Sequence, residues 1–260
     1  MKTYHHFRIE VADRIATVTF DRPPVNAVSV EVYSEMRDWS IALGASDDVH
    51  VVVLTAPLDR KAWCGGADLN EFLKLDSGSR RDRYAHINEC VPHFAKLPKP
   101  VIAAMTGHAV GVGMVFATLC DIRIGSDSAF FAVPEIDRGV VAGGGAFFSK
   151  LGMPEGLVRE MCYTGRRFTA AELHSSGFLN RTLPGTEVLP SAIELAHSIA
   201  DKSLPALRAT KLSALFAEDN TWMDAYLTSQ EFAAELTGMA DSKEGIRAFL
   251  ERRTPQYTGR

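Results

Sequence analysis

The chain has 260 residues, of which 46% are hydrophobic and 23% are charged. This balance is typical of a folded globular protein and excludes a disordered chain. The formal net charge is −4 and the isoelectric point lies near 6.1, so the sequence has no basic field that would hold nucleic acid or an anionic membrane. We therefore expect neither as a partner.

Cysteine usage and hydropathy indicate the cellular compartment. The four cysteines, Cys64, Cys90, Cys120 and Cys162, lack the paired spacing of a zinc or redox site, so we expect free thiols and no metal. Residues 1–14 carry charges and histidines where a secretory signal needs an apolar run. No segment reaches roughly 18 consecutive apolar residues, the length of a membrane span. These patterns indicate a cytoplasmic protein, or one in an organelle matrix after loss of a leader.

The first quarter of the chain alternates between strand and helix patterns. Residues 14–20 alternate apolar and polar side chains, which predicts a half-buried strand, and a turn follows at 21–24. Ser29 is placed to cap a helix with apolar residues at helical spacing through Leu43. Residues 49–55 form an almost wholly apolar run, which predicts a strand covered on both faces.

The same alternation continues through the middle of the chain. A glycine-rich turn and a polar helical stretch end near Cys90, and residues 100–105 predict another buried strand. An apolar helix then ends near Cys120, and residues 121–124 resume a strand pattern. Strands that alternate with helices indicate an α/β architecture.

The last third of the chain has helical patterns without intervening strands. The expected helices cover residues 192–200, 205–217, 221–236 and 243–253. Capping boxes are expected at Thr169 with Glu172 and at Asp241 with Glu244. We therefore divide the chain into an α/β core, residues 1–185, and an all-helical region, residues 186–260, whose apolar stripes predict packing against the core or a neighbouring subunit.

Three segments between these elements have residues suited to chemistry, and each also has an ordinary structural explanation. Residues 63–69 contain glycines that can turn N–H groups outward, or form a simple loop before a capped helix. Residues 107–114 let a ligand approach a helix amino terminus, or let a strand and a helix pack closely. Glu135, beside Pro134 and a glycine tract at 139–145, is either an acid/base with a raised pKa or a solvated turn residue.

Taken in order, these segments resemble the crotonase superfamily, the enoyl-CoA hydratase/isomerase family. The likeness covers nearly the whole chain. It begins at Arg22-Pro23-Pro24-Val25-Asn26-Ala27, continues through Cys64-Gly65-Gly66-Ala67-Asp68, the stretch 107–113 with Cys120-Asp121, and Pro134-Glu135, and ends at residues 245–253. The resemblance implies a crotonase-like core of repeated ββα units with a C-terminal all-helical region, which covers coenzyme A and assembles the chain as a homotrimer or a dimer of trimers.

The resemblance also implies roles for single residues. Two main-chain N–H groups bind a thioester oxygen as an oxyanion hole in that family, and the matching positions here are Gly65 and Val112. Such donors stabilise the enolate that forms when a proton leaves the carbon beside the thioester. Val112 is bulkier than the usual glycine but keeps its N–H. Glu135 matches one of the two glutamates of the hydratases.

The other hydratase glutamate is absent, because its position holds Val115, which cannot titrate. Water addition by Glu135 alone needs another group to hold the water, and Asp137 and His108 are the nearest candidates, although a turn cap and a hydrogen-bonded loop histidine are the ordinary explanations for them. A single Glu135 still suffices to move a proton between two carbons of one acyl group.

Coenzyme A binding is expected to follow the family. Its adenine would lie against the backbone of Lys61, Ala62 and Trp63, and a tail cation, Arg252, would lie near the phosphates. Its pantetheine arm would run past Gly66, Ala67, Asp68 and Leu69, with Gly111 beside the second amide. No further cofactor is expected, since coenzyme A is part of the substrate.

The expected activity is hydration of a 2-enoyl-CoA to a 3-hydroxyacyl-CoA. The absence of the second glutamate keeps two alternatives open: a double-bond isomerase that uses Glu135 alone, and an acyl-CoA-binding protein without turnover.

Overall fold

Six strands form the main sheet in the computed structural model, which describes residues 2–143, 148 and 151–259. Their order is β1-β2-β4-β7-β9-β12; β1 runs antiparallel to β2, and the other neighbours are parallel. The strands are β1 Phe7–Ala12, β2 Ile15–Phe20, β4 Val51–Thr55, β7 Val101–Met105, β9 Ile122–Ser126 and β12 Arg181–Leu183.

The chain repeatedly leaves this sheet to form a second, smaller one. The second sheet has the order β11-β10-β8-β5, and a further pair joins β3 to β6. These strands are β3 Ala27–Val28, β5 Ala62–Cys64, β6 Gly66–Ala67, β8 His108–Val110, β10 Phe130–Ala132 and β11 Phe168–Thr169. Thus β4 leads to β5, β7 to β8 and β9 to β10, each followed by a helix. This succession is the repeated ββα unit that the sequence predicted.

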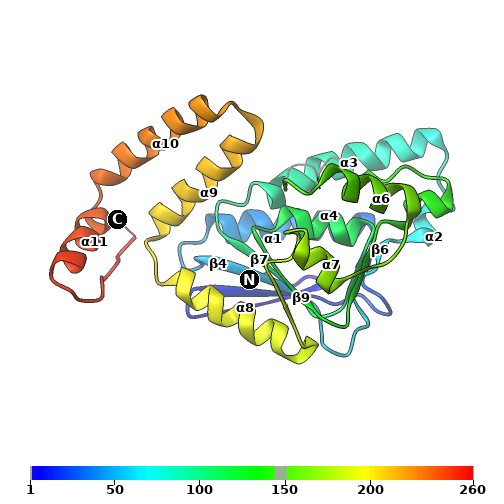
Figure 1. The fold of residues 1–260 in the computed structure, drawn as a ribbon, viewed down its shortest axis with the longest axis horizontal. Coiled ribbons are helices and arrows are strands. Elements are labelled where there is room, and N and C mark those ends of the chain that lie inside the picture. The colour runs from blue at the N-terminus through cyan, green and yellow to red at the C-terminus, as the bar shows by residue number, and fades with distance from the viewer. Residues whose placement is uncertain (1, 144–147, 149–150, 260) are drawn as a thin grey trace.

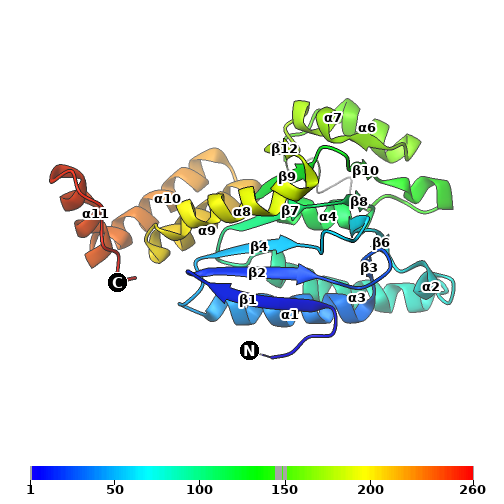
Figure 2. The same cartoon turned by 90° about the horizontal axis from the view of Figure 1, so that it is seen from below.

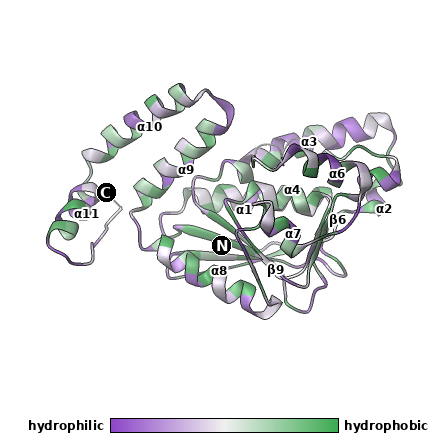
Figure 3. Ribbon diagram, in the orientation of Figure 1, coloured by the Kyte–Doolittle hydropathy of each residue, from purple (hydrophilic) through white to green (hydrophobic). Residues whose placement is uncertain are grey.

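Helices cover both faces of the main sheet (Figure 1). On one face α1, Val30–Ala45, α3, Ser77–Ala95, and α4, Val112–Leu119, pack around Trp39 and Phe94, both of which are fully buried. On the other face α8, Gly185–Ala200, packs every fourth residue from Val188 to Ala200 against the sheet. In Figure 3 the strands between these layers are largely hydrophobic. All five residues of β4 are buried, as expected for a strand covered on both faces.

The remaining helices are short units near the second sheet and an arm at the C-terminus. Three helices form the arm, which extends away from the sheets (Figures 1 and 2). These elements are α2 Leu69–Phe72, the 3₁₀ helix η1 Pro134–Arg138, α6 Glu155–Thr164 and α7 Ala170–Ser175, and, in the arm, α9 Leu204–Asp219, α10 Trp222–Thr237 and α11 Ala240–Leu250. Among the described helices, none has both the length and the apolar character that crossing a membrane requires.

Local signals at helix ends were read correctly in two cases and wrongly in one. Ser29 caps α1 by accepting from Val32 N, and Thr169 forms the expected capping box with α7. The capping box at Asp241 is wrong, because that carboxylate lies inside α11 and accepts from the N–H groups of Thr258 and Gly259. The helix predicted from residue 192 begins at Gly185. Of the predicted glycine tract, Gly144 and Gly145 lie outside the described residues.

Candidate active site

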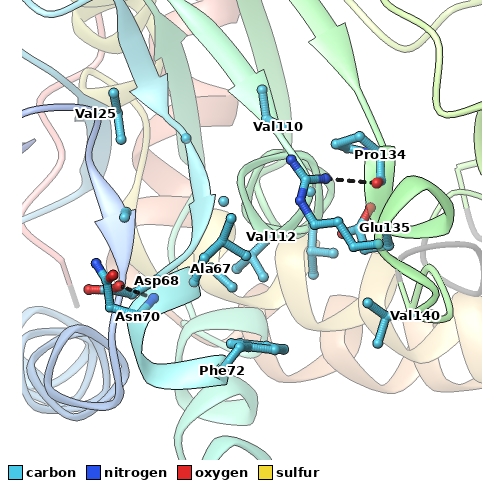
Figure 4. Close-up of a pocket in the computed structure, with 18 of the residues that line it drawn as sticks. Val25, Ala67, Asp68, Asn70, Phe72, Val110, Val112, Pro134, Glu135 and Val140 are labelled. Carbon is cyan, nitrogen blue, oxygen red and sulfur yellow. Dashed lines mark hydrogen bonds between the residues drawn. The ribbon is translucent and has the colours of Figure 1, made fainter. Parts of the chain in front are cut away.

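A cavity of about 620 Å³ lies where β6, the start of α4 and η1 come together. Figure 4 shows Ala67 and Val112 facing its centre and Glu135 at one side. Its size is typical of a small-molecule site, and its wall is mainly apolar with a few polar groups. The lining residues used below are Arg22, Val25, Tyr33, Gly65, Gly66, Ala67, Asp68, Leu69, Phe72, Arg80, Arg83, Tyr84, Ile87, Gly111, Val112, Val115, Pro134, Glu135 and Arg138.

One main-chain amide from β6 is directed into this cavity. Asp68 N donates to Val28 O at 2.9 Å, and β6 pairs with β3 in parallel register. Successive N–H groups of a strand point to opposite sides, so the N–H of Ala67 points away from β3 and toward the cavity that Ala67 lines. The strand thereby supplies one donor from Ala67.

The donor role expected for Gly65 is contradicted by the same local geometry. Its N–H donates to Val25 O at 2.9 Å and lies 3.2 Å from Asn26 O. An N–H that is already bonded within the protein is not free for a ligand oxygen. Gly65 therefore shapes the wall, and the donor in this segment is two residues further along the chain, at Ala67.

A second amide comes from the start of α4. Val112 is the first residue of that helix, so its N–H has no partner within the helix. Gly111 precedes Val112 and has φ 55°, a backbone conformation that residues other than glycine rarely adopt. The amino end of a helix also carries partial positive charge, which favours an anionic ligand atom. Val112 lines the cavity, and its role as a donor stays a prediction.

Two glycines allow the segments that carry these amides to approach each other. A Cβ on Gly113 would lie 2.5 Å from Cys64 O, and a Cβ on Gly66 would lie 2.9 Å from Val110 O. Both distances are shorter than real Cβ contacts, so a side chain at either position would push the two segments apart. These glycines therefore fix how close the two donors are.

Glu135 supplies the carboxylate of the cavity. It lies in the first turn of η1, after Pro134, and a Cβ on Gly111 would lie only 2.7 Å from its Oε1. Its Oε2 is buried and has no hydrogen-bond partner among the described residues. Burial raises the pKa of Glu135, with smaller opposing contributions from its own backbone and from Arg138. The group therefore holds a proton more readily than an ordinary carboxylate does, which suits an acid/base.

The two groups proposed to assist Glu135 do not face the cavity. His108 Nδ1 accepts from Phe130 N at 3.1 Å, and the two rings stack with centroids 3.9 Å apart. Asp137 is directed toward Gly165 at the end of α6, where a Cβ would meet its Oδ2 at 2.9 Å. Neither lines the cavity. Val115 does line it, so an apolar side chain occupies the position that holds a second glutamate in the resembled hydratases.

The expected coenzyme A residues divide into two groups. The cavity is lined by Gly66, Ala67, Asp68, Leu69 and Gly111, whose contact with coenzyme A stays a prediction. Lys61, Ala62 and Trp63 do not line it, and the last two are buried. Arg252 follows α11 in the arm, away from the cavity (Figure 1).

An ion pair and a buried amide hold the loop that forms one edge of the cavity. Arg22 donates to Asp68 Oδ2 at 2.7 Å, and this contact lowers the pKa of Asp68. Asn26 is fully buried, and its side-chain N–H donates to Phe20 O and Ala62 O. These contacts tie the loop after β2 to the strand that leads into β6.

Sequence reasoning missed a polar wall of the cavity formed by Tyr33, Phe72, Arg80, Arg83 and Tyr84. The available signal was the spacing of three and four residues from Arg80 to Tyr84, which places them on one helix face. The sequence led us to expect no metal, and the cavity does not test that expectation. Among the described residues His5, Glu31 and Glu35 could share an ion, but they lie outside its wall.

Comparisons with known proteins agree with this architecture. The family model described as enoyl-CoA hydratase/isomerase matches residues 10–260. A probable enoyl-CoA hydratase of Mycobacterium bovis is 30% identical over 99% of this chain and 100% of its own length. A probable enoyl-CoA hydratase of Rhizobium meliloti is 31% identical over 99% and 100%. An enoyl-CoA hydratase structure from Geobacillus kaustophilus superposes with a TM-score of 0.91 at 29% identity, covering 99% of each chain.

A crotonase-like α/β core with acyl-CoA chemistry is the class that this fold and cavity define. The chain belongs to the enoyl-CoA hydratase/isomerase family. The fold class and the family that the sequence predicted are therefore confirmed.

The raised pKa of Glu135 predicts how stability depends on pH. Because the folded pKa lies above the unfolded value, the ionised carboxylate destabilises the folded state, and this penalty is lost as pH falls through the folded pKa. We expect Glu135→Gln to raise the melting temperature at neutral pH, and the gain to vanish below the ordinary carboxyl pKa of 4.5. Thermal unfolding across this range, with the exposed Glu194→Gln as control, measures it. A Glu135→Gln protein less stable than the parent at neutral pH would contradict the assignment.

Proposed function

We propose that this chain hydrates 2-enoyl-CoA thioesters, using the amides of Ala67 and Val112 as an oxyanion hole and Glu135 as the acid/base. The observation that carries the proposal is the meeting of two directed N–H groups and one half-buried carboxylate in a single cavity. An acyl-CoA substrate follows from the family to which the chain belongs.

The amides stabilise the negative charge that the reaction creates. When water adds to C3 of a 2-enoyl thioester, electrons move onto the thioester oxygen and form an enolate. Two donors already aimed at that oxygen stabilise it without reorganisation, and one such donor contributes about 2.7–4 kcal/mol. The amino end of α4 adds its partial positive charge through Val112.

Glu135 moves the proton in both halves of the reaction. Its carboxylate takes a proton from the attacking water as the oxygen bonds to C3. The resulting carboxylic acid then gives a proton to C2, the enolate collapses, and Glu135 returns to its starting state. The unpartnered Oε2 is available for the water, since the described protein gives it no other hydrogen bond.

Val115 favours a second candidate, isomerisation of 3-enoyl-CoA to 2-enoyl-CoA. In that reaction Glu135 removes a proton from C2 and returns it to C4, and no water must be held. The apolar side chain of Val115 in the cavity wall supports this reaction. A chain that binds acyl-CoA without turnover is the remaining alternative.

The proposal includes how coenzyme A and the assembly are arranged. We place the pantetheine arm along Gly66 to Leu69, which line the cavity. A homotrimer or a dimer of trimers is supported by large apolar side chains exposed on the arm, at Trp222, Tyr226, Phe249 and Leu250. Arg252 lies in the same arm and would meet coenzyme A only in such an assembly. A cytoplasmic location completes the proposal.

Turnover of two substrates separates the candidates. We expect the pure protein to convert 2-enoyl-CoA to 3-hydroxyacyl-CoA, and Glu135→Gln to lower kcat by about 10²–10⁴-fold, because the proton carrier is lost. Absorbance of the conjugated thioester, with chromatography of the products, measures both. Conversion of 3-enoyl-CoA alone would establish the isomerase, and binding without product would establish the non-catalytic protein. Unimpaired turnover by Glu135→Gln would refute the acid/base assignment.

Proline at position 112 removes the second donor without a side-chain charge change. The first position of a helix tolerates proline, because its N–H has no helical partner. We expect Val112→Pro to lower kcat/KM by about 10²–10³-fold, the effect of one oxyanion-hole donor. Ala240→Pro makes the same change at the first residue of α11 and should leave kcat/KM unchanged. Equal kcat/KM of Val112→Pro and Ala240→Pro would refute the role of the Val112 amide.

Restoring a carboxylate at position 115 tests what limits hydration. Val115 lines the cavity, so Val115→Glu places a second group that can orient the water. We expect a rise of about 10²-fold in the hydration rate, the lower end of what a positioned acid/base contributes, whereas Val115→Gln should give little gain. Initial rates with 2-enoyl-CoA decide this. No gain with the glutamate would mean that the lack of this carboxylate is not the limitation.

A further inference from the structure

Helix α3 turns one polar face toward the cavity. Arg80, Arg83, Tyr84 and Ile87 line the cavity, and their spacing places them on one side of the helix. The guanidinium carbons of Arg80 and Arg83 lie 4.6 and 5.1 Å from the centroid of the Phe72 ring. One side of the cavity thus gathers two arginines around a single aromatic ring. We call Tyr33, Phe72, Arg80, Arg83 and Tyr84 the arginine wall.

The two arginines have too few acidic partners. Arg83 pairs with Glu71 Oε2 at 3.2 Å, and the same carboxylate also accepts from the main-chain N–H of Val30. Arg80 donates to the hydroxyl of Tyr84 at 2.9 and 3.1 Å. Within the described part of the chain Arg80 forms no ion pair. The two guanidinium groups of the arginine wall therefore have one carboxylate beside them, that of Glu71, which also accepts from the N–H of Val30.

This surplus of positive charge costs stability. Arg83 is 7% exposed, and its Nε is buried without a hydrogen-bond partner among the described residues, which is unfavourable for a cation. Arg80 and Arg83 are three residues apart near the amino end of α3, so they repel each other and oppose the helix dipole. Asp76 caps that end, Asp82 is exposed, and neither pairs with these arginines in the described structure. An anionic ligand group would offset this cost.

The inner part of the arginine wall lies deep in the cavity. Tyr33 is 4% exposed and Arg83 is 7% exposed, whereas Tyr84 at the outer end of the wall is 44% exposed and Val25 on another part of the lining is 43% exposed. Figure 4 shows Val25 and Phe72 on opposite sides of Ala67 and Val112. Coenzyme A carries charged phosphates that stay in water, so it needs an exposed side of the cavity, and Val25 marks one that lies away from the two arginines (Figure 4). With the thioester oxygen at the two amides, the acyl tail points toward the wall.

We propose that the acyl group bound by this chain ends in a carboxylate, held by Arg80 and Arg83. This inference rests on the proposed function, since it defines the substrate class of the same cavity. A guanidinium group is a planar fork that can donate two parallel hydrogen bonds to a carboxylate, and the Tyr84 hydroxyl lies beside Arg80 to add another. A methyl end would leave the two cations with only the shared carboxylate of Glu71.

Binding of saturated acyl-CoA pairs tests the proposal without turnover. Calorimetry compares coenzyme A thioesters of straight chains of six, eight and ten carbons that end in a carboxylate or in a methyl group. At the best-fitting length we expect the carboxylate to bind at least about tenfold tighter, which corresponds to about 1.4 kcal/mol. Equal or tighter binding of the methyl-ended thioester at every length would overturn the proposal.

Variants of the wall identify the responsible groups. Arg80→Met should bring the ratio of the two affinities close to one while the affinity for the methyl-ended thioester and for free coenzyme A stays the same. Arg83→Gln should do likewise, with near-ultraviolet circular dichroism to confirm folding, because Arg83 is buried. Arg81 is exposed and outside the cavity wall, so Arg81→Met is the matched control and should keep the ratio. A ratio that survives Arg80→Met in a folded protein would overturn the assignment.

These measurements separate the two proposals. A carboxylate preference that depends on Arg80, in a protein that turns over neither 2-enoyl-CoA nor 3-enoyl-CoA, would sustain the carboxylate site and refute the proposed reaction. Turnover of methyl-ended enoyl-CoA without any carboxylate preference would sustain the reaction and refute the carboxylate site. A loss of free coenzyme A binding in Arg80→Met would assign the arginines to the coenzyme phosphates and also refute it.

Discussion

The site depends on the close approach of residues 64–67 to residues 110–113. A Cβ at Gly113 would lie 2.5 Å from Cys64 O, and a Cβ at Gly66 would lie 2.9 Å from Val110 O. Side chains there would separate the two segments, and the amides of Ala67 and Val112 would no longer face one cavity. The oxyanion hole, the place of the thioester and the direction of the acyl tail all depend on this approach.

A third absent side chain, at Gly111, sets the place of the carboxylate. Gly111 has φ 55°, and a Cβ on it would meet Glu135 Oε1 at 2.7 Å. The carboxylate therefore lies against the backbone that ends in the Val112 amide, where burial raises its pKa. The apolar side chain of Val115 completes this part of the wall. The result is a site with one proton carrier, which suits proton transfer on a bound enolate and leaves the water with fewer partners than two carboxylates would give.

Much of the fold could be predicted because long, periodic segments have strong local signals. Residues 51–55, which form β4, are apolar except for Thr55, and the Ser29 cap with its apolar stripe marks α1. Strand β1 was missed although residues 7–11 alternate apolar and polar side chains, and in the structure only Phe7 of its six residues is buried. Strand β8 has three residues, too few for a period. Asp241 was read as a cap because its true partners, Thr258 and Gly259, come from a loop that no local pattern announces.

The sequence by itself determined the α/β class, the family, the position of Glu135 and the apolar residue at Val115, because these follow from residue types and their order. The tertiary structure decided which amide of the glycine turn faces the ligand. The N–H of Gly65 bonds to Val25 O, whereas Asp68 N bonds to Val28 O across the β3–β6 pair and turns the N–H of Ala67 the other way, so the donor is Ala67 rather than Gly65. It also decided that Arg80 and Arg83 lie in the wall of the cavity, since a helix face is periodic in sequence but its direction depends on the elements packed against it.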